Sequence, residues 1–272
     1  PTLILASRDP HTRGVQTGDR LTSAVGAPEA VITARRALSR DEAGLDDSIR
    51  AKLADAPHWS LWRVTPSCIE VTLDRELAVA AGDSLFSPDR MGNGFVFANN
   101  RIHSSGRLLI KAAGRIEGNV LDTPHALVVC PEVPGAAAAG IAGLVIRGNT
   151  IRHAGGFCPA YESSQAGALS ITRGAGAHDL APAGTFHDLL IEDNLFEDCA
   201  GPQLVVTATR GLVIRNNRFV RPHHQPAGIT GAAYGIAKDA VIWIANCKDV
   251  DLGPNPVTDP GPHSGEAVVQ KP

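Results

Sequence analysis

The sequence predicts an all-β protein built around a parallel β-helix, and three observations support this fold class. Between residues 91 and 260 a motif recurs in which an aliphatic residue or Phe precedes an Asn by three positions and an apolar residue follows it by two. Short strands of alternating aliphatic and mixed positions lie between the copies. The chain of 272 residues also contains 28 glycines and 19 prolines, which favours turns and disfavours a helical bundle.

The motif predicts about six rungs, a rung being one complete turn of the chain through the β-helix. The clear copies and one weaker, final copy centre on Asn100, Asn119, Asn149, Asn194, Asn217 and Asn255. Asn suits a fixed corner because it tolerates the left-handed backbone conformation of a tight bend. Its side-chain amide can also bond to the Asn of the next rung, so we expect an Asn ladder.

A second strand lies between the Asn motifs. Its copies align without gaps at Leu108–Lys111, Leu127–Cys130, Leu169–Thr172, Leu204–Thr207 and Ile242–Ala245. The first and third positions are aliphatic and are expected to face inward, whereas the second and fourth are expected to face outward. The alternative is an α/β fold, but it needs helices of about 10–15 residues between the strands, and glycines leave little room for them.

Residues 13–90 lack the Asn motif, and we expect them to form a small β-rich, barrel-like insertion with one helix. A capping-box pattern over Ser39–Glu42 opens this helix, which is expected over about residues 40–54. The alternation over Ile69–Leu73 predicts a strand.

The two ends of the chain are assigned separately. Residues 1–12 are expected to supply a strand of an earlier rung, which implies that upstream rungs are missing. Residues 261–272 are expected to be a tail that follows the β-helix. The chain starts at Pro1 without a signal peptide, so we expect a processed or truncated N-terminus.

Composition excludes several classes of function. The net charge of −3 and the pI of about 6.4 offer no basic surface for a nucleic acid. No apolar run reaches the roughly 18 residues that a membrane span needs. The cysteines form no CxxC pair and the histidines lack HxxxH or HxH spacing, so neither a metal site nor a cofactor site is expected. The sequence leaves the oligomeric state open.

Charged residues recur three positions after successive motif asparagines, at His103, Asp122, Arg152 and Glu197. Adjacent rungs are about 4.8 Å apart, so these side chains are expected to be neighbours. They form either a surface salt-bridge ladder, which contributes little stability, or the wall of a groove into which Asp122 or Asp198 points.

Glu132 is the second candidate carboxylate. It lies two residues past Cys130, at a strand end that faces loops, where a glycosidase could place an acid or a base. Lys111 belongs to an outward column and is expected to be partly buried there unless a carboxylate meets it, with Glu132 as the plausible partner. Arg107 begins the same strand as Lys111. The alternative is a purely structural role for Glu132.

The longest loops follow Ile151, Arg173 and Phe219, and loops of neighbouring rungs can stack to wall a groove. The candidate substrate-binding residues are Arg107, Lys111, His125, Arg152, Glu162, Arg173 and His223.

Residues 94–132 resemble the right-handed parallel β-helix proteins of carbohydrate metabolism, and are most similar to glycoside hydrolase family 110, the exo-acting α-1,3-galactosidases. The likeness is carried by Gly106–Ile110, Ile116–Asn119, Glu132 at the end of the next strand, and Leu144–Asn149. The resemblance implies a right-handed β-helix and an inverting, metal-free hydrolysis by two carboxylates. Val133–Ala136 replace a stretch of the family that contains Trp and Glu, which implies a related but distinct specificity.

Three functions follow as hypotheses. The first is a glycoside hydrolase that removes a terminal sugar, such as α-galactose, from an oligosaccharide or polysaccharide with Glu132 and Asp122. The second is a polysaccharide lyase acting on a uronic-acid polymer, in which arginines and Lys111 neutralise the uronate. The third is a glycan-binding β-helix without catalysis. Because complex glycans are met outside the cytoplasm, we expect a secreted or periplasmic protein.

Overall fold

The computed structural model describes residues 1–7, 15–24, 26–44, 67–83, 85–130, 140–156, 161–174 and 178–272. These residues are almost entirely strand and turn, and they form two compact units, the larger of which begins at Gly94. None of the described helices is long and apolar enough to cross a membrane.

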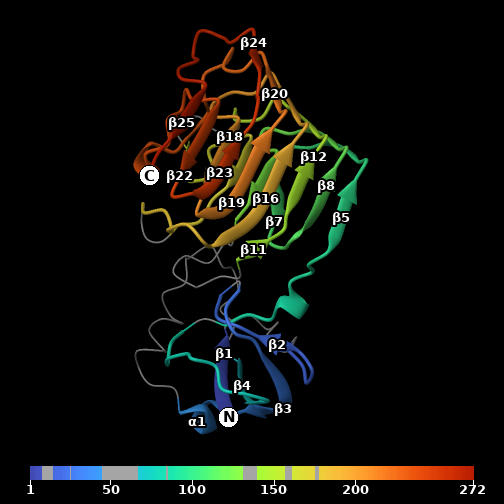
Figure 1. The fold of residues 1–272 in the computed structure, drawn as a ribbon, viewed down its shortest axis with the longest axis vertical. Coiled ribbons are helices and arrows are strands. Elements are labelled where there is room, and N and C mark those ends of the chain that lie inside the picture. The colour runs from blue at the N-terminus through green and yellow to red at the C-terminus, as the bar shows by residue number, and fades with distance from the viewer. Residues whose placement is uncertain are drawn as a thin grey trace. The chain divides into compact units, whose positions relative to one another are not determined.

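Three parallel sheets make up the larger unit (Figure 1). The β5 sheet contains β5 (Phe95–Ala98), β8 (Gly114–Glu117), β12 (Val145–Arg147), β16 (Phe186–Glu192), β19 (Thr209–Arg215) and β23 (Lys248–Leu252), with β11 (Ile141–Ala142) paired to β16. The β6 sheet contains β6 (Arg101–His103), β9 (Val120–Asp122), β13 (Thr150–Arg152), β17 (Leu195–Glu197), β20 (Arg218–Val220) and β24 (Val257–Thr258). The β7 sheet contains β7 (Leu108–Ile110), β10 (Leu127–Val129), β15 (Leu169–Ile171), β18 (Leu204–Thr207), β22 (Ile242–Ala245) and β25 (Val268–Gln270). The chain visits the three sheets in turn and then adds the next strand to each.

The expected Asn ladder is present in the corner between the β5 and β6 sheets. Nδ2 of Asn149 donates to Oδ1 of Asn194 at 2.9 Å, and the same bond links each motif Asn to the next, from Asn100 to Asn255. The left-handed residue, however, is mostly the one before the ladder Asn, as at Gly118 and Gly148 with φ of 64° and 63°. The ladder Asn itself is thereby free to point inward.

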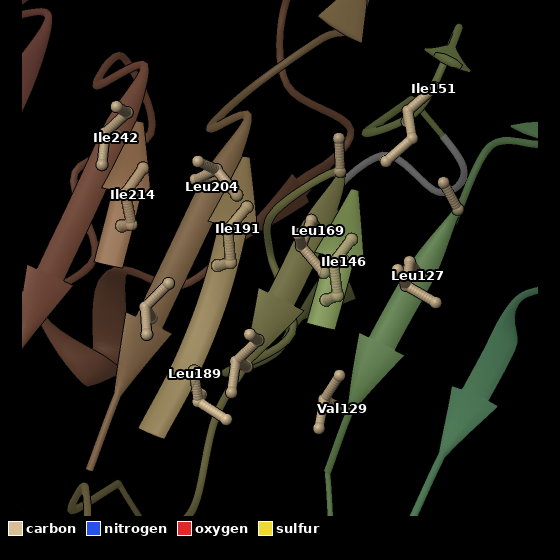
Figure 2. Packing of buried hydrophobic residues seen from close by; sticks show 14 of the residues in the cluster. Leu127, Val129, Ile146, Ile151, Leu169, Leu189, Ile191, Leu204, Ile214 and Ile242 are labelled. Carbon is tan, nitrogen blue, oxygen red and sulfur yellow. The ribbon is translucent and has the colours of Figure 1, made fainter. Parts of the chain in front are cut away.

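Aliphatic side chains fill the space between the sheets. Figure 2 shows Leu127, Leu169, Leu204 and Ile242 of the β7 sheet in one row, and Ile146, Ile191 and Ile214 of the β5 sheet in another. All of these side chains are buried. Because the inward positions stack in register, each rung extends the same core, as the aliphatic alternation predicted.

The outer face of the β7 sheet is covered rather than open. Val205 and Trp243, at positions expected to face outward, pack with Ile229 and Ile236 in a second apolar cluster. These last two belong to the loop between β20 and β22, which contains β21 (Ile229–Thr230) and the short helix η3 (Ala232–Tyr234). β21 pairs in parallel with β14 (Tyr161–Glu162) of another loop. The alternation of side chains along these strands therefore predicted correctly which residues face outward. It did not predict that the outward-facing residues are buried.

The smaller unit contains one antiparallel sheet with the strand order β1-β4-β3-β2. Its elements are β1 (Thr2–Ser7), β2 (Arg20–Leu21), β3 (Ala30–Leu38), α1 (Arg40–Ala43), β4 (Ser67–Leu73) and η2 (Pro88–Arg90). Leu21, Ile32, Ile69 and Val71 form its core.

Three sequence-based boundaries differ from the structure. The strand over residues 1–12 does not belong to an earlier rung, because β1 pairs antiparallel with β4. The capping box is present, but α1 ends where Gly44 adopts φ of 54°, and residues 45–54 lie outside the described residues. The expected tail over residues 261–272 instead contains β25, which pairs with β22.

Candidate functional site

A column of charged residues crosses four neighbouring strands of the β6 sheet. The backbone register aligns His103 with Asp122, Asp122 with Arg152, and Arg152 with Glu197. The guanidinium of Arg152 lies 2.7 Å from the carboxylate of Glu197, an ion pair without the angle of a hydrogen bond. The alignment predicted from the Asn spacing is therefore confirmed, and its members form two separate pairs, His103 with Asp122 and Arg152 with Glu197.

Asp122 is the centre of this column, because a histidine meets each of its oxygens. Nδ1 of His153 lies 2.8 Å from Oδ1, and Nδ1 of His103 lies 3.5 Å from Oδ2. The hydrogen bond from His153 lowers the pKa of Asp122, partial burial opposes this effect, and the charges of the two histidines add to it. The Asp122 side chain is 33% exposed. Asp122 is therefore an ionised carboxylate that a ligand can reach.

His153 is the member of this group that sequence reasoning did not select as a site residue. It follows β13 directly, and its backbone is left-handed with φ of 56°. Its side chain reaches Asp122, which belongs to the preceding rung. The only sequence feature that pointed to His153 as a site residue was its position next to Arg152 of the charged column.

A second polar group lies where strands of the β7 sheet begin. Arg107 precedes β7, His125 precedes β10 and Gln165 precedes β15, so the three come from successive rungs. The guanidinium of Arg107 donates a hydrogen bond to Oε1 of Gln165. Burial lowers the pKa of His125, and the charge of Arg107 lowers it further, so the imidazole is neutral at pH 7. The structure thus brings two predicted substrate-binding residues, Arg107 and His125, together.

The charged column around Asp122 and the group of Arg107, His125 and Gln165 lie on either side of the same turn of the chain. In the second rung only residues 123–126 separate Asp122 from the start of β10. In the third rung the N–H of Gly155 donates to the carbonyl of Pro124 at 2.8 Å, and a Cβ on Gly155 would lie 1.7 Å from the carbonyl oxygen of Ala200. Only glycine fits this close approach. We call the following residues the polar corner: His103, Arg107, Asp122, His125, Arg152, His153 and Gln165.

A comparable charge ladder on the β5 sheet shows what distinguishes the polar corner. There, Glu192 accepts hydrogen bonds from Arg147 at 2.7 Å and from Arg215 at 2.9 Å. Its side chain is only 10% exposed, and both partners are permanently charged. Asp122 is more exposed and is held by histidines. Alternating charge alone therefore does not mark a site, whereas a reachable carboxylate between two titratable rings is unusual within this protein.

Among the described residues, the other predicted site residues lie outside the polar corner. Lys111 is exposed and not partly buried. Glu132 lies outside the described residues, and Glu162 lies in β14. His223 is buried, and its Nδ1 shares a hydrogen bond with Oγ of Ser264 at 3.1 Å, so it supports the fold.

Arg173 is buried at the end of β15, at the opposite end of that strand from Gln165.

Among the described residues, no three His, Cys, Asp or Glu side chains are placed to hold a metal ion. No family model, curated protein or solved structure matches this chain.

Proposed function

We propose that the larger unit is a right-handed parallel β-helix. Its three parallel sheets, visited in the same cyclic order in every rung, and its continuous Asn ladder support this fold. The right-handed sense rests on the rule that crossovers between parallel strands of one sheet are right-handed in about 98% of cases.

We further propose that this β-helix is a glycoside hydrolase that removes a terminal sugar, such as α-galactose, from a glycan. The observation that carries the proposal is Asp122, an ionised and partly exposed carboxylate on a polar corner that is rich in hydrogen-bond donors. Each carboxylate oxygen has two lone pairs, so Asp122 can accept a proton from water while His103 and His153 hold its position. Hydrolysis outside the cytoplasm then requires export, and we propose a secreted or periplasmic location.

The mechanism is inverting and assigns one role to each of two carboxylates. Asp122 is the general base that removes a proton from the attacking water. A carboxylic acid protonates the leaving glycosidic oxygen, and we assign this role to Glu132. Such a pair stands about 6.5–9.5 Å apart, which leaves room for the water. Arg107 and Arg152 bind substrate hydroxyls, because guanidinium groups donate hydrogen bonds in a fixed planar geometry.

The test measures release of a monosaccharide from aryl α-glycosides and from oligosaccharides by the full chain. We expect Asp122→Asn and Glu132→Gln each to lower kcat/KM by about 10²–10⁴-fold, the usual contribution of a general acid or base. Asp74→Asn is the matched control, because Asp74 of the smaller unit is comparably exposed and pairs with Arg75 at 2.9 Å. The control should retain its activity within about threefold, as its ion pair is a surface one. Full activity in both site variants would refute the site.

A polysaccharide lyase is the second candidate, and the contact between His153 and Asp122 favours it. A carboxylate that holds the Nδ1 proton of a histidine leaves Nε2 to act as a base. His153 could then remove the proton next to a uronate carboxylate, with Arg152 neutralising the charge. An unsaturated product that absorbs in the ultraviolet, lost in His153→Gln, would establish the lyase. Glycan binding without any turnover would establish the third hypothesis, a binding protein.

A further inference from the structure

Arg173 is a buried arginine that has no acidic partner among the described residues. It directly follows Thr172 at the end of β15 and is only 6% exposed. Nη1 of its guanidinium is buried and makes no hydrogen bond. Its backbone N–H donates to Oγ1 of Thr207 at 3.2 Å, which fixes where the side chain begins.

The contrast with other arginines of the same unit is clear. Arg147 and Arg215 each pair with Glu192, and Arg221 pairs with Asp198, although these arginine side chains are 46–48% exposed. For Arg173, burial lowers the pKa, and the nearby Cys130 thiol opposes this effect. A buried charge without a partner costs several kcal/mol, because water no longer solvates it. An anionic ligand that binds the guanidinium would offset this free-energy cost of the buried charge.

A second unpartnered polar atom belongs to the preceding residue, Thr172. Oγ1 of Thr172 is buried and makes no hydrogen bond, and the residue is fully covered. Thr172 pairs with Cys130 across the β7 sheet, since its N–H donates to the carbonyl of Val129 at 3.1 Å. A buried guanidinium edge without a partner matches the oxygens of a carboxylate, and the unpaired hydroxyl of the neighbouring residue is a further hydrogen-bond donor.

We propose that Arg173 and Thr172 form a binding site for the carboxylate of an acidic sugar. The inference rests on the proposed function, because it takes the ligand to be a glycan, and it deepens that function by naming a uronate as part of the substrate. Because Arg173 is only 6% exposed, the ligand reaches it with its carboxylate and the sugar ring stays outside.

The position of this site gives it a separate role from the polar corner. β15 is three residues long and separates Arg173 from the end where Gln165 lies, which corresponds to about 10 Å along the strand. Arg173 is therefore a specificity residue that holds a neighbouring sugar, and Asp122 acts on the bond to be broken.

The experiment compares galacturonate with galactose, two sugars that differ in the carboxylate, by calorimetric titration and thermal shift. We expect the full chain to bind galacturonate at least tenfold more tightly than galactose. Arg173→Met should abolish this preference, and Arg173→Lys should reduce it because the planar fork is lost. Thr172→Val should weaken it, whereas Arg218→Met, at an exposed position of β20, should leave it unchanged.

The thermal stability without ligand adds an independent readout. Removing an unpaired buried charge should leave the melting temperature of Arg173→Met unchanged or raise it, whereas breaking a hidden ion pair would lower it strongly. A strong decrease in that variant, or equal binding of the two sugars by the full chain, overturns the proposal. Equal stabilisation by acetate and galacturonate would overturn the assignment to an acidic sugar.

These results are separate from those for catalysis. Asp122→Asn should bind galacturonate as the unaltered chain does. Asp122 precedes β10 of the β7 sheet, whereas Arg173 lies at the opposite end of the strands of that sheet. Uronate preference without any turnover would reject the hydrolase and the lyase but support the site. Turnover that depends on Asp122 without uronate preference would reject the site alone.

Discussion

Single residues of the larger unit show how burial separates histidines with different roles. His103 and His153 contact Asp122 and are 89% and 60% exposed, whereas His125 and His223 are buried. The sequence could predict that His103 and Asp122 are neighbours, because the Asn repeat fixes the strand register. It could not predict the contact of His153, which depends on a left-handed backbone that only a few per cent of non-glycine residues adopt.

The buried histidines predict a pH dependence of stability. Burial is the main cause that lowers the pKa of both His125 and His223 below the ordinary value of 6.5. The unfolded chain therefore binds more protons than the folded chain below about pH 6.5, and the free energy of unfolding falls as the pH drops from there. We expect His223→Gln to flatten the slope between pH 5 and 7, measured by urea unfolding. His178→Gln, at an exposed position, serves as the control. A slope unchanged in His223→Gln would contradict the prediction.

At the scale of elements, the strand pairs and the ladder followed from the sequence, but the covering loops did not. The motif Asn recurs at a fixed phase, so the bonding partner of Asn149 could be inferred from the order of the copies. The period of a strand says which side a residue faces and not what lies on that side. Apolar Val128, Val205 and Trp243 at outward positions were the available signal for a covering layer.

The ladder predicts a graded loss of stability along the larger unit. Nδ2 of Asn149 donates to Asn194 and to the carbonyl of Ile116, and its Oδ1 accepts from Asn119. Asn149→Ala leaves buried donors and acceptors unpaired, so we expect the free energy of unfolding to fall by about 2–3 kcal/mol. Asn255→Ala, at the less buried last position, should cost clearly less. Urea unfolding of both variants provides the measurement, and equal losses would show that burial does not set the strength of the ladder.

At the scale of the whole molecule, the core of the larger unit and the core of the smaller unit have no residue in common. Ile146 belongs to the core between the three parallel sheets, and Val71 to the core of the antiparallel sheet. The sequence indicated two separate regions because residues 13–90 lack the Asn motif. It misassigned β1, since the alternation within one strand does not tell whether the partner strand is parallel or antiparallel.

Separate cores predict that the chain unfolds in two calorimetric transitions. Cooperative all-or-none unfolding is expected within a single domain and is not expected across units with their own cores. Val71 and Ile146 are both fully buried, and truncating such a side chain to Ala typically costs about 2–5 kcal/mol. We therefore expect Val71→Ala to lower the midpoint of one transition and Ile146→Ala to lower the midpoint of the other. A single transition lowered by both substitutions would show that the two units fold as one.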